Sequence, residues 1–475
     1  MPSKQPRLIY LMGIGGIAMG TLAGMLSDAG YRVTGSDRGV YPPMSTFLAE
    51  LRVPVYSGYD AAHLSEADPD LVVIGNVIRR DNPEAQWVLA NDRPYLSMPQ
   101  AIARFFLDGR GSLVVAGTHG KSTSSALLGW VLEHSGFDPT LLVGAVLKDR
   151  GLGYRIGSGP QMVLEGDEYD TAFFDKGSKF LHYRPDIGIV TSIEFDHADI
   201  FRDFDHVFSA FQAFARIIPE TGTLIINGDD PACRRLAADC QGRVLTYGHG
   251  PRCDCRILDI AFGNREVTTR FATPWHGDFR LRSKLPGRHN AANVLAVLTA
   301  TWSRGVSLDA FQDALLTFPG IKRRQDLLLD CDGIVAIDDF AHHPTAVRET
   351  IAAIARFYPG RRLLAVFEPR TNSSRRNFFQ HDYALAFDRA DWIAIAPPAD
   401  MDQVPAAERL DLDRLIGDIR DRGGNARQFA DAAAVLDALL NTVRRGDLVL
   451  FMSNGSFDGL PQRFTEAIQR RHQAS

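Results

Sequence analysis

"SLVVAGTHGKSTSSALLGWVLEHS", residues 112–135, joins a short apolar run to a helix-like segment through a glycine-containing loop. A phosphate-binding loop needs backbone N–H groups around the phosphates, a lysine to neutralise them and a hydroxyl for Mg²⁺. Lys121 and Ser122 supply the last two. The first glycine of the usual G-x-x-x-x-G-K-[ST] pattern would fall at Val115, so this loop departs from the standard form. The stretch nevertheless predicts an α/β domain with a nucleoside triphosphate site.

A second glycine-rich turn lies near the start of the chain, in "LIYLMGIGGIAMG", residues 8–20. Gly13, Gly15 and Ala18 match G-x-G-x-x-G/A directly after a predicted strand, and Asp37 ends the next one. This pattern ordinarily suggests NAD, but any nucleoside diphosphate suits glycines that let the backbone approach a pyrophosphate. A tight turn with a purely structural role is the alternative.

The chain of 475 residues has room for about three domains. Short apolar runs alternate with polar turns and with apolar residues at helical spacing, which predicts parallel sheets with crossover helices. We expect a Rossmann-like domain over 1–107, a central P-loop ATPase-like domain over 108–317 and a second Rossmann-like domain over 318–475. The fold class is therefore α/β.

Composition narrows the class of protein. Charged residues make up 23% and the formal net charge is −5, so no general basic field is present to attract nucleic acid. Residues 8–27 carry no charge, but five glycines at turn spacing argue against a signal peptide or a membrane anchor. Five cysteines without CxxC pairs fit a reducing cytoplasm. We expect a cytoplasmic enzyme of small molecules, either a monomer or a weak homo-oligomer.

Two polar residues at strand ends are candidates for a metal site. Glu165 follows "MVL" and His197 ends "TSIEFDH". Ligands in open α/β sheets gather at the carboxyl ends of strands, where both residues would meet the loop that carries Ser122. Mg²⁺ prefers oxygen ligands, so a hydrogen-bonded surface role for His197 is an equal alternative. The acidic residues of 165–170 could likewise form only a solvated loop.

Further polar groups follow. "LPGRHNAANVLAV", residues 285–297, places His289, Asn290 and Asn293 at a helix start, where amides can bind a purine edge or merely cap the helix. "GIKRRQ" at 320–325 and "DDFAHHP" at 338–344 add cationic and carboxylate groups from the third domain.

"GTHGKS", "DH", "GRHNAAN" and "DDFAHHP", in this order, resemble the Mur ligases, the ATP-dependent amide-forming enzymes of peptidoglycan synthesis. The phosphate loop of that family has the form G-T-x-G-K-[ST], which accounts for the departure from the standard pattern. The resemblance covers nearly the whole chain. It implies that the first glycine loop holds the diphosphate of a UDP-sugar and that the second holds ATP with Mg²⁺.

The resemblance also implies roles for individual residues. Lys121 would bind the β- and γ-phosphates, Asp339 the ribose, and Arg324 and His342 the phosphates as the third domain closes. The catalytic set would be Lys121, Glu165, His197 and Arg324, and the metal ligands Ser122, Glu165 and His197. The ATP site would comprise Gly117, Thr118, His119, Gly120, Lys121, Ser122, Thr123, His289, Asn290, Asn293, Arg324, Asp339 and His342. The UDP site would comprise Gly13, Ile14, Gly15, Gly16, Ser36, Asp37 and Asn76.

One feature departs from the family pattern. Several relatives use a carbamylated lysine shortly after the "DH", and residues 198–220 contain no lysine. A second metal ion would therefore need another ligand or a different position.

Three stretches indicate which members of the family are most similar. "GSDRGVYPPMST" (35–46), "FEPRTNSSRR" (367–376) and "MSNGSFDG" (452–459) resemble members that join UDP-N-acetylmuramate to the recycled murein tripeptide L-Ala-γ-D-Glu-meso-diaminopimelate, through an acyl phosphate. Members that add L-alanine to UDP-N-acetylmuramate are the nearest alternative. An NAD-dependent oxidoreductase and a nucleotide-dependent regulatory protein are the alternatives from other classes.

Overall fold

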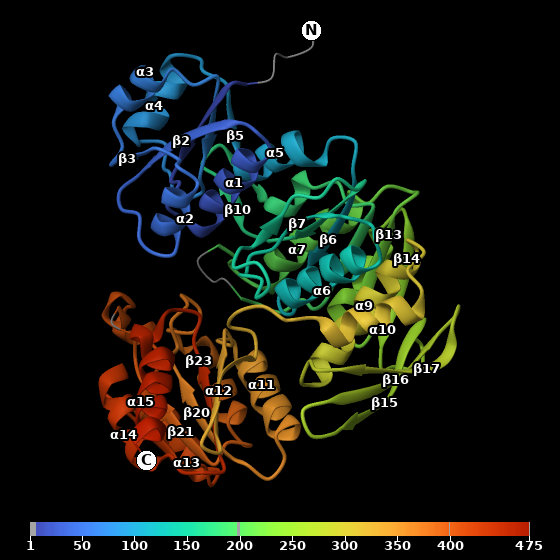
Figure 1. Cartoon of the computed structure of the whole chain (residues 1–475), viewed down its shortest axis with the longest axis vertical. Coiled ribbons are helices and arrows are strands. Elements are labelled where there is room, and N and C mark those ends of the chain that lie inside the picture. Colours follow the sequence, from blue (N-terminus) through green and yellow to red (C-terminus); the bar gives the residue numbers. More distant parts are fainter. Residues whose placement is uncertain (1–5, 197–199, 399, 475) are drawn as a thin grey trace.

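The computed structural model describes residues 6–196, 200–398 and 400–474. It contains three α/β units along the chain, which confirms the fold class expected from the sequence (Figure 1). Within the described residues, no helix is both long and apolar enough to cross a membrane.

The first unit is a parallel sheet of five strands in the order β3-β2-β1-β4-β5. The order reverses beside β1, which is the position where open α/β sheets bind ligands. Buried apolar residues such as Ile9 and Leu11 make β1 a central strand. The strands are β1 (Leu8–Met12), β2 (Arg32–Asp37), β3 (Val55–Ser57), β4 (Leu71–Ile74) and β5 (Tyr95–Ser97). The helices are α1 (Ile17–Asp28), α2 (Met44–Glu50), α3 (Ala61–Ala67), α4 (Pro83–Ala90) and α5 (Met98–Ile102).

The second unit contains a sheet of ten strands in the order β17-β16-β15-β14-β13-β12-β6-β9-β7-β8. Pairing is parallel from β15 to β7 and antiparallel at both ends. All residues of the central strand β12 are buried, because helices cover both faces of the sheet. Its strands are β6 (Gly111–Ala116), β7 (Thr140–Leu142), β8 (Tyr154–Arg155), β9 (Gln161–Glu165), β12 (Ile187–Val190), β13 (Thr223–Asn227), β14 (Arg243–Gly248), β15 (Cys255–Phe262), β16 (Val267–Thr273) and β17 (Gly277–Ser283).

Helices α6 (Lys121–His134), α9 (Arg288–Trp302) and α10 (Leu308–Thr317) pack on one face of this sheet. Helix α7 (Phe204–Arg216) lies on the other face, in a core shared with the first unit. Helix α8 (Pro231–Arg235) follows β13, and β10 (Asp170–Ala172) pairs with β11 (Asp175–Ser178) in a separate hairpin. The shared core makes the first two units one continuous packing unit.

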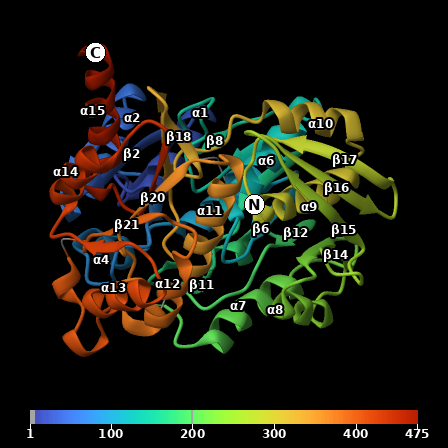
Figure 2. The ribbon, with the colours of Figure 1, turned by 90° about the horizontal axis from the view of Figure 1, so that it is seen from below.

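The third unit is a sheet of six strands in the order β18-β19-β23-β20-β21-β22, antiparallel only between β18 and β19. Helices α11 to α13 cover one face, and α14 and α15 cover the other (Figure 2). The strands are β18 (Asp326–Cys331), β19 (Ile334–Asp339), β20 (Arg362–Phe367), β21 (Trp392–Ile395), β22 (Ala426–Gln428) and β23 (Asp447–Met452). The helices are α11 (Pro344–Phe357), α12 (Gln380–Ala386), α13 (Leu412–Asp421), α14 (Ala432–Thr442) and α15 (Leu460–Ala474).

The segment between α10 and β18 joins the second unit to the third. Gly320, Arg323 and Gln325 all have positive φ there. Non-glycine residues rarely adopt that conformation, so the chain turns sharply at this junction. The boundaries proposed from the sequence, after residues 107 and 317, fall between elements of neighbouring sheets.

Candidate active site

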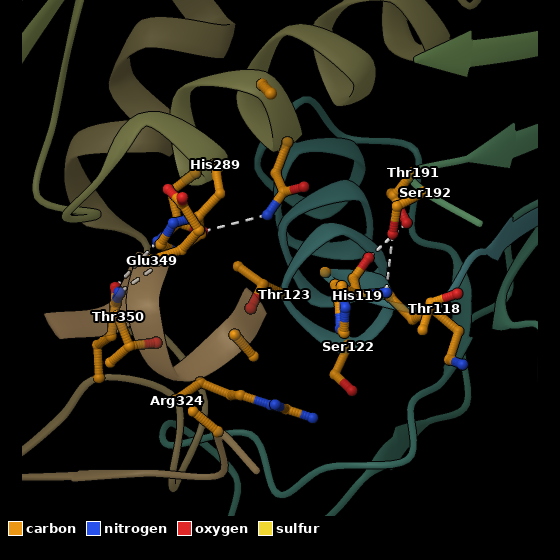
Figure 3. A pocket seen from close by; sticks show the side chains of 18 of the residues that line it. Thr118, His119, Ser122, Thr123, Thr191, Ser192, His289, Arg324, Glu349 and Thr350 are labelled. Carbon is orange, nitrogen blue, oxygen red and sulfur yellow. Dashed lines mark hydrogen bonds between the residues drawn. The ribbon is translucent and has the colours of Figure 1, made fainter. Parts of the chain in front are cut away.

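A cavity of about 280 Å³ lies where the phosphate loop, the start of α9 and the third unit meet (Figure 3). Its wall includes nearly the whole ATP site expected from the sequence, with Gly117 as the exception. The residues of that set on the wall are Thr118, His119, Gly120, Lys121, Ser122, Thr123, His289, Asn290, Asn293, Arg324, Asp339 and His342.

Two glycines shape the phosphate loop between β6 and α6. Gly117 has φ +129°, and a Cβ there would lie 2.1 Å from Thr191 Oγ1. Gly120 has φ +78°, and its Cβ would lie 2.8 Å from Asn293 Oδ1. Neither position accepts a larger residue without strain. Gly120 is also the N-cap of α6, so the free N–H groups of this helix begin at the cavity.

Lys121 donates a hydrogen bond from Nζ to Glu168 Oε2 at 2.7 Å. Burial favours the neutral amine, but the carboxylates of Glu168, Asp167 and Glu165 outweigh it and raise the pKa of Lys121. Glu168 itself is 3% exposed, so a merely solvated acidic loop does not describe it. The loop after β9 therefore keeps a cation charged beside the helix N-terminus.

The carboxylate of Glu165 faces the hydroxyl of Ser122. Ser122 Oγ donates to Glu165 Oε1 at 2.9 Å, and the backbone N–H of Gly144 donates to Oε2 at 2.7 Å. A hydroxyl and an oriented carboxylate are oxygen ligands of the kind Mg²⁺ prefers, so the pair fits that ion. His197, the third expected ligand, lies outside the described residues.

The other end of the cavity is lined by the start of α9. Gly287 is the N-cap of this helix, so Asn290 and Asn293 do not cap it. Asn290 Nδ2 donates to Gln325 Oε1 at 2.9 Å, and Asn293 Nδ2 donates to Asn290 Oδ1 at 3.2 Å. The buried Nδ1 of His289 has no partner. Asn290 Nδ2 also donates to the Pro286 carbonyl at 2.7 Å, so both of its N–H groups are engaged, and His289 Nδ1 and the second N–H of Asn293 are left for a purine edge.

The third unit contributes a cation and an anion to the same cavity. Burial lowers the pKa of the Arg324 guanidinium, which lies 4.6 Å above the Phe340 ring. Burial raises the pKa of Asp339, whose oxygens accept the N–H groups of Gln325 at 2.8 Å and Ala341 at 2.7 Å. Arg324 in the junction and Asp339 at the end of β19 thus line the same cavity as the phosphate loop.

The glycine loop of the first unit lies outside this cavity. Gly13 has φ +78°, and the N–H of Gly15 already donates to Asp37 Oδ2 at 2.9 Å. Gly16 is the N-cap of α1, and Asn76 Nδ2 donates to the carbonyl of Asp170 at 3.1 Å, across to the second unit. The free donors for an anion are therefore those at the start of α1.

Ser36, another residue of the expected UDP site, is held by hydrogen bonds within the first unit. Its side chain is fully buried, and Oγ donates to Glu84 Oε2 at 2.5 Å. Its carbonyl accepts the N–H groups of Gly13 at 2.8 Å and Ile14 at 3.1 Å. The carbonyl of Ser36 therefore holds the glycine loop in place, and its side chain is bound to Glu84 instead.

Several wall residues were not foreseen from the sequence. Glu194, Gln325, Thr345 and Glu349 line the cavity although the sequence analysis named none of them as a site residue. Glu194 could have been found from the sequence, since it lies in the same "TSIEFDH" stretch as His197.

Three large apolar side chains of the first unit are exposed to solvent: Ile17, Tyr41 and Val77 are 62–76% exposed.

Family models match all three units. "Mur ligase family, catalytic domain" matches residues 8–110, "Mur ligase middle domain" matches 115–301, and "Mur ligase, glutamate ligase domain" matches 323–455.

Known proteins match over nearly the full length. A UDP-N-acetylmuramate–L-alanyl-γ-D-glutamyl-meso-2,6-diaminoheptandioate ligase from Haemophilus influenzae is 36% identical, with 97% of this chain and 99% of that protein covered. A UDP-N-acetylmuramate–L-alanine ligase from Symbiobacterium thermophilum is 33% identical over 98% and 95%. The crystal structure of a murein peptide ligase from Psychrobacter arcticus has a TM-score of 0.70 at 31% identity, over 97% and 98%.

Proposed function

Since this chain belongs to the Mur ligase family, we propose that it is an ATP-dependent ligase that joins UDP-N-acetylmuramate to L-Ala-γ-D-Glu-meso-diaminopimelate in peptidoglycan recycling. One observation supports this most: a single cavity unites Lys121, the Ser122 and Glu165 pair, and Arg324 of the third unit. The full-length likeness to the tripeptide-adding relatives supports the choice of amine. The L-alanine ligases, at 30–34% identity, are the second candidate.

ATP would bind with its phosphates at the start of α6. Lys121 stays charged there, and the helix N-terminus offers oriented N–H groups to the phosphate oxygens. Ser122 and Glu165 would hold Mg²⁺, which neutralises phosphate charge when bound. Asn290, Asn293 and His289 would face the adenine, and Asp339 would accept the ribose hydroxyls.

The muramoyl carboxylate is a poor electrophile and must first be activated. One of its oxygens attacks the γ-phosphorus, the bond to the β–γ bridging oxygen breaks, and ADP leaves behind an acyl phosphate. The amine of the tripeptide then attacks the acyl carbon, loses a proton and displaces phosphate. Lys121 and Arg324 offset the repulsion between the anions in the first step, the kind of stabilisation that dominates phosphoryl transfer.

Water must be excluded, because it would hydrolyse the acyl phosphate before the amine attacks. Arg324 and Asp339 of the third unit form part of the cavity wall opposite the phosphate loop. Closure about the junction at 318–325 therefore serves both to assemble the site and to dry it.

UDP-N-acetylmuramate would bind to the first unit at the start of α1. The carboxylate of Asp37 occupies the Gly15 N–H, so it must turn toward the ribose before a diphosphate can approach that donor. The exposed Ile17, Tyr41 and Val77 provide apolar surface in the same unit. We expect the enzyme to act in the cytoplasm, where both substrates are soluble.

Phosphate release and product mass test the assignment. The purified protein would be incubated with ATP, Mg²⁺ and UDP-N-acetylmuramate, with either the diaminopimelate tripeptide or free L-alanine as the amine. We expect release with the tripeptide and a product heavier by the tripeptide minus water. Release with L-alanine alone would transfer the assignment to the second candidate, and release with neither would contradict both.

A further inference from the structure

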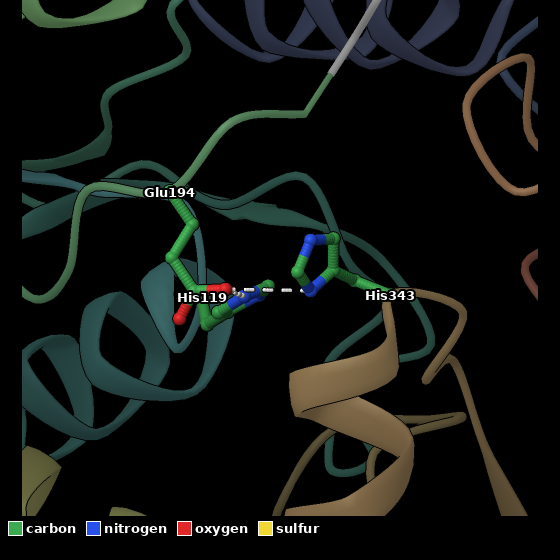
Figure 4. Close-up of side chains that lie close together, drawn as sticks. All are labelled: His119, Glu194 and His343. Atoms are coloured by element: carbon green, nitrogen blue, oxygen red, sulfur yellow. Dashed lines mark ion pairs between the residues drawn. The ribbon is translucent and has the colours of Figure 1, made fainter. Parts of the chain in front are cut away.

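Three side chains that commonly bind metals meet beside the ATP cavity, apart from the Ser122 and Glu165 pair, and two of them, His119 and Glu194, line its wall. His119 comes from the phosphate loop, Glu194 follows β12, and His343 is the N-cap of α11 in the third unit (Figure 4). One ligating atom of each lies within 4.8 Å of the other two. Within residues 6–196, 200–398 and 400–474, no other group of three such side chains meets this criterion.

The distances in this cluster are too long for good hydrogen bonds. His119 Nε2 and His343 Nδ1 each lie 3.4 Å from Glu194 Oε2, whereas N–H···O bonds centre near about 2.9 Å. Two ligands of a tetrahedral ion with bonds of about 2.05 Å lie about 3.3 Å apart. The spacing therefore matches a shared cation better than a direct contact.

The burial of these side chains agrees with the distances. The His343 side chain is only 7% exposed, and the buried Nε2 atoms of His343 and His119 have no hydrogen-bond partner. Glu194 is half-buried, with 34% of its side chain exposed. A partly buried carboxylate between two imidazoles is an environment that a cation would stabilise.

We propose that His119, Glu194 and His343 bind one divalent cation of the zinc class, which ties the third unit to the phosphate loop. Two imidazoles and one carboxylate are typical zinc ligands, whereas Mg²⁺ prefers oxygen ligands. Three protein ligands leave the fourth position of a tetrahedral ion open to another ligand. Two of the three, His119 and Glu194, line the ATP cavity. This site requires no lysine shortly after the "DH", and residues 198–220 contain none.

Thr345 supports the same arrangement from the third unit. Its hydroxyl donates to Glu194 Oε2 at 2.9 Å, which orients the carboxylate as partners of metal ligands commonly do. Its backbone N–H lies 3.3 Å from His343 Nδ1, at the long end of the hydrogen-bond range, so a cation would displace only a weak contact.

Cobalt binding tests the proposal without ATP or peptide, so its outcome is independent of the proposed ligase reaction. The full chain would be stripped with a chelator and titrated with Co²⁺, whose visible absorption reports coordination geometry. We expect one Co²⁺ per chain, without a thiolate charge-transfer band, and displacement by Zn²⁺. His119→Ala and His343→Ala should each weaken binding beyond the ~10–100-fold that loss of an outer partner costs.

Matched variants separate this site from others. His134→Ala removes an exposed imidazole on α6, and Glu165→Gln alters the expected Mg²⁺ site; both should bind Co²⁺ as the wild type does. Glu194→Gln keeps the size of the side chain and should lose Co²⁺ while its melting curve in chelator stays near that of the wild type.

A second readout tests the bridge between the two units. Zn²⁺ should protect the junction at 318–325 from proteolysis in the wild type and not in His343→Ala. Equal Co²⁺ affinity in wild type and His119→Ala, or loss of Co²⁺ in Glu165→Gln with retention in His343→Ala, would overturn the proposal.

Discussion

The two glycine loops of this chain have similar local form and different surroundings. Each follows a buried parallel strand, has a glycine at φ +78° and precedes a helix. At the loop of the second unit, Lys121 is the first residue of the helix, and Arg324 reaches the same cavity. At the loop of the first unit, the acidic Asp37 occupies the Gly15 N–H. The two loops therefore have similar backbones, but Lys121 and Arg324 lie beside the second and a carboxylate lies on the first.

Lys121→Ala should have the largest effect, because it removes the cation that distinguishes the second loop from the first. Loss of the ammonium leaves the phosphates unneutralised, so we expect kcat to fall by about 10³-fold or more, with little change in the KM for UDP-N-acetylmuramate. Phosphate release measures the rate, and a melting curve reports whether the fold survives. Lys176→Ala, which removes a lysine whose side chain is 70% exposed, is the control and should keep normal turnover. Near-normal activity of Lys121→Ala would refute the assigned role.

Glu165→Gln should have the next largest effect. The amide keeps the shape but offers Mg²⁺ a weaker ligand than the carboxylate. We expect the Mg²⁺ concentration for half-maximal rate to rise by about 10–100-fold, with partial rescue at high Mg²⁺. A Mg²⁺ titration of phosphate release measures this. An unchanged Mg²⁺ requirement would place the ion elsewhere.

Gly15→Ala tests the loop of the first unit by itself. Its Cβ would lie 3.0 Å from Asp37 Oδ2 and 3.1 Å from Val40 Cγ2, so it would crowd the diphosphate site. We expect the KM for UDP-N-acetylmuramate to rise by about 10-fold, or about 1.4 kcal/mol, and the KM for ATP to stay constant. Gly417→Ala, in α13 of the third unit, is the control, because a Cβ there would have no neighbour within 4 Å. A change in the KM for ATP would contradict the separation of the two loops.

Asp338→Asn should have the smallest effect of these variants. The quantity that changes should be the stability of the folded chain. Burial and the nearby Asp339 and Asp326 outweigh Arg323 and raise the pKa of Asp338 to about 7. Between its unfolded value of about 3.9 and this value the folded state binds the extra proton, so stability falls as pH rises through this window. The amide of the Asp338→Asn variant cannot ionise. This variant should therefore unfold at a higher temperature than the wild type at pH 8, by roughly 2–4 °C for each kcal/mol of added stability.

Thermal melts at pH 4 and pH 8 check this sign. The difference between Asp338→Asn and the wild type should vanish at pH 4, where Asp338 is protonated in the folded chain. A larger difference at pH 4 than at pH 8 would mean that the contact of Asp338 with Arg323, at 3.4 Å, governs stability instead.

Local pattern was sufficient to predict most of the polar side chains that line the cavity. A lysine and a hydroxyl after a glycine turn, and amides at a helix start, carry their chemistry wherever the chain places them. Residues without such a pattern were missed: Glu194 and Thr345 join the cavity from two units, and no spacing in the sequence links them. Ser36 shows another limit of sequence patterns: its position in a strand did not reveal that its side chain binds Glu84.

The amino-acid sequence alone therefore determined the α/β class, the three units, the two glycine loops and the ligase family, because these depend on periodicity and on contiguous motifs. The folded chain decided which side chains meet. Asp37 on the Gly15 N–H, Glu168 on Lys121, and the cluster of His119, Glu194 and His343 arise from residues 22 to 224 positions apart, brought together by sheet order and by the junction at 318–325. Such encounters depend on how whole sheets pack, and no short stretch of sequence encodes that.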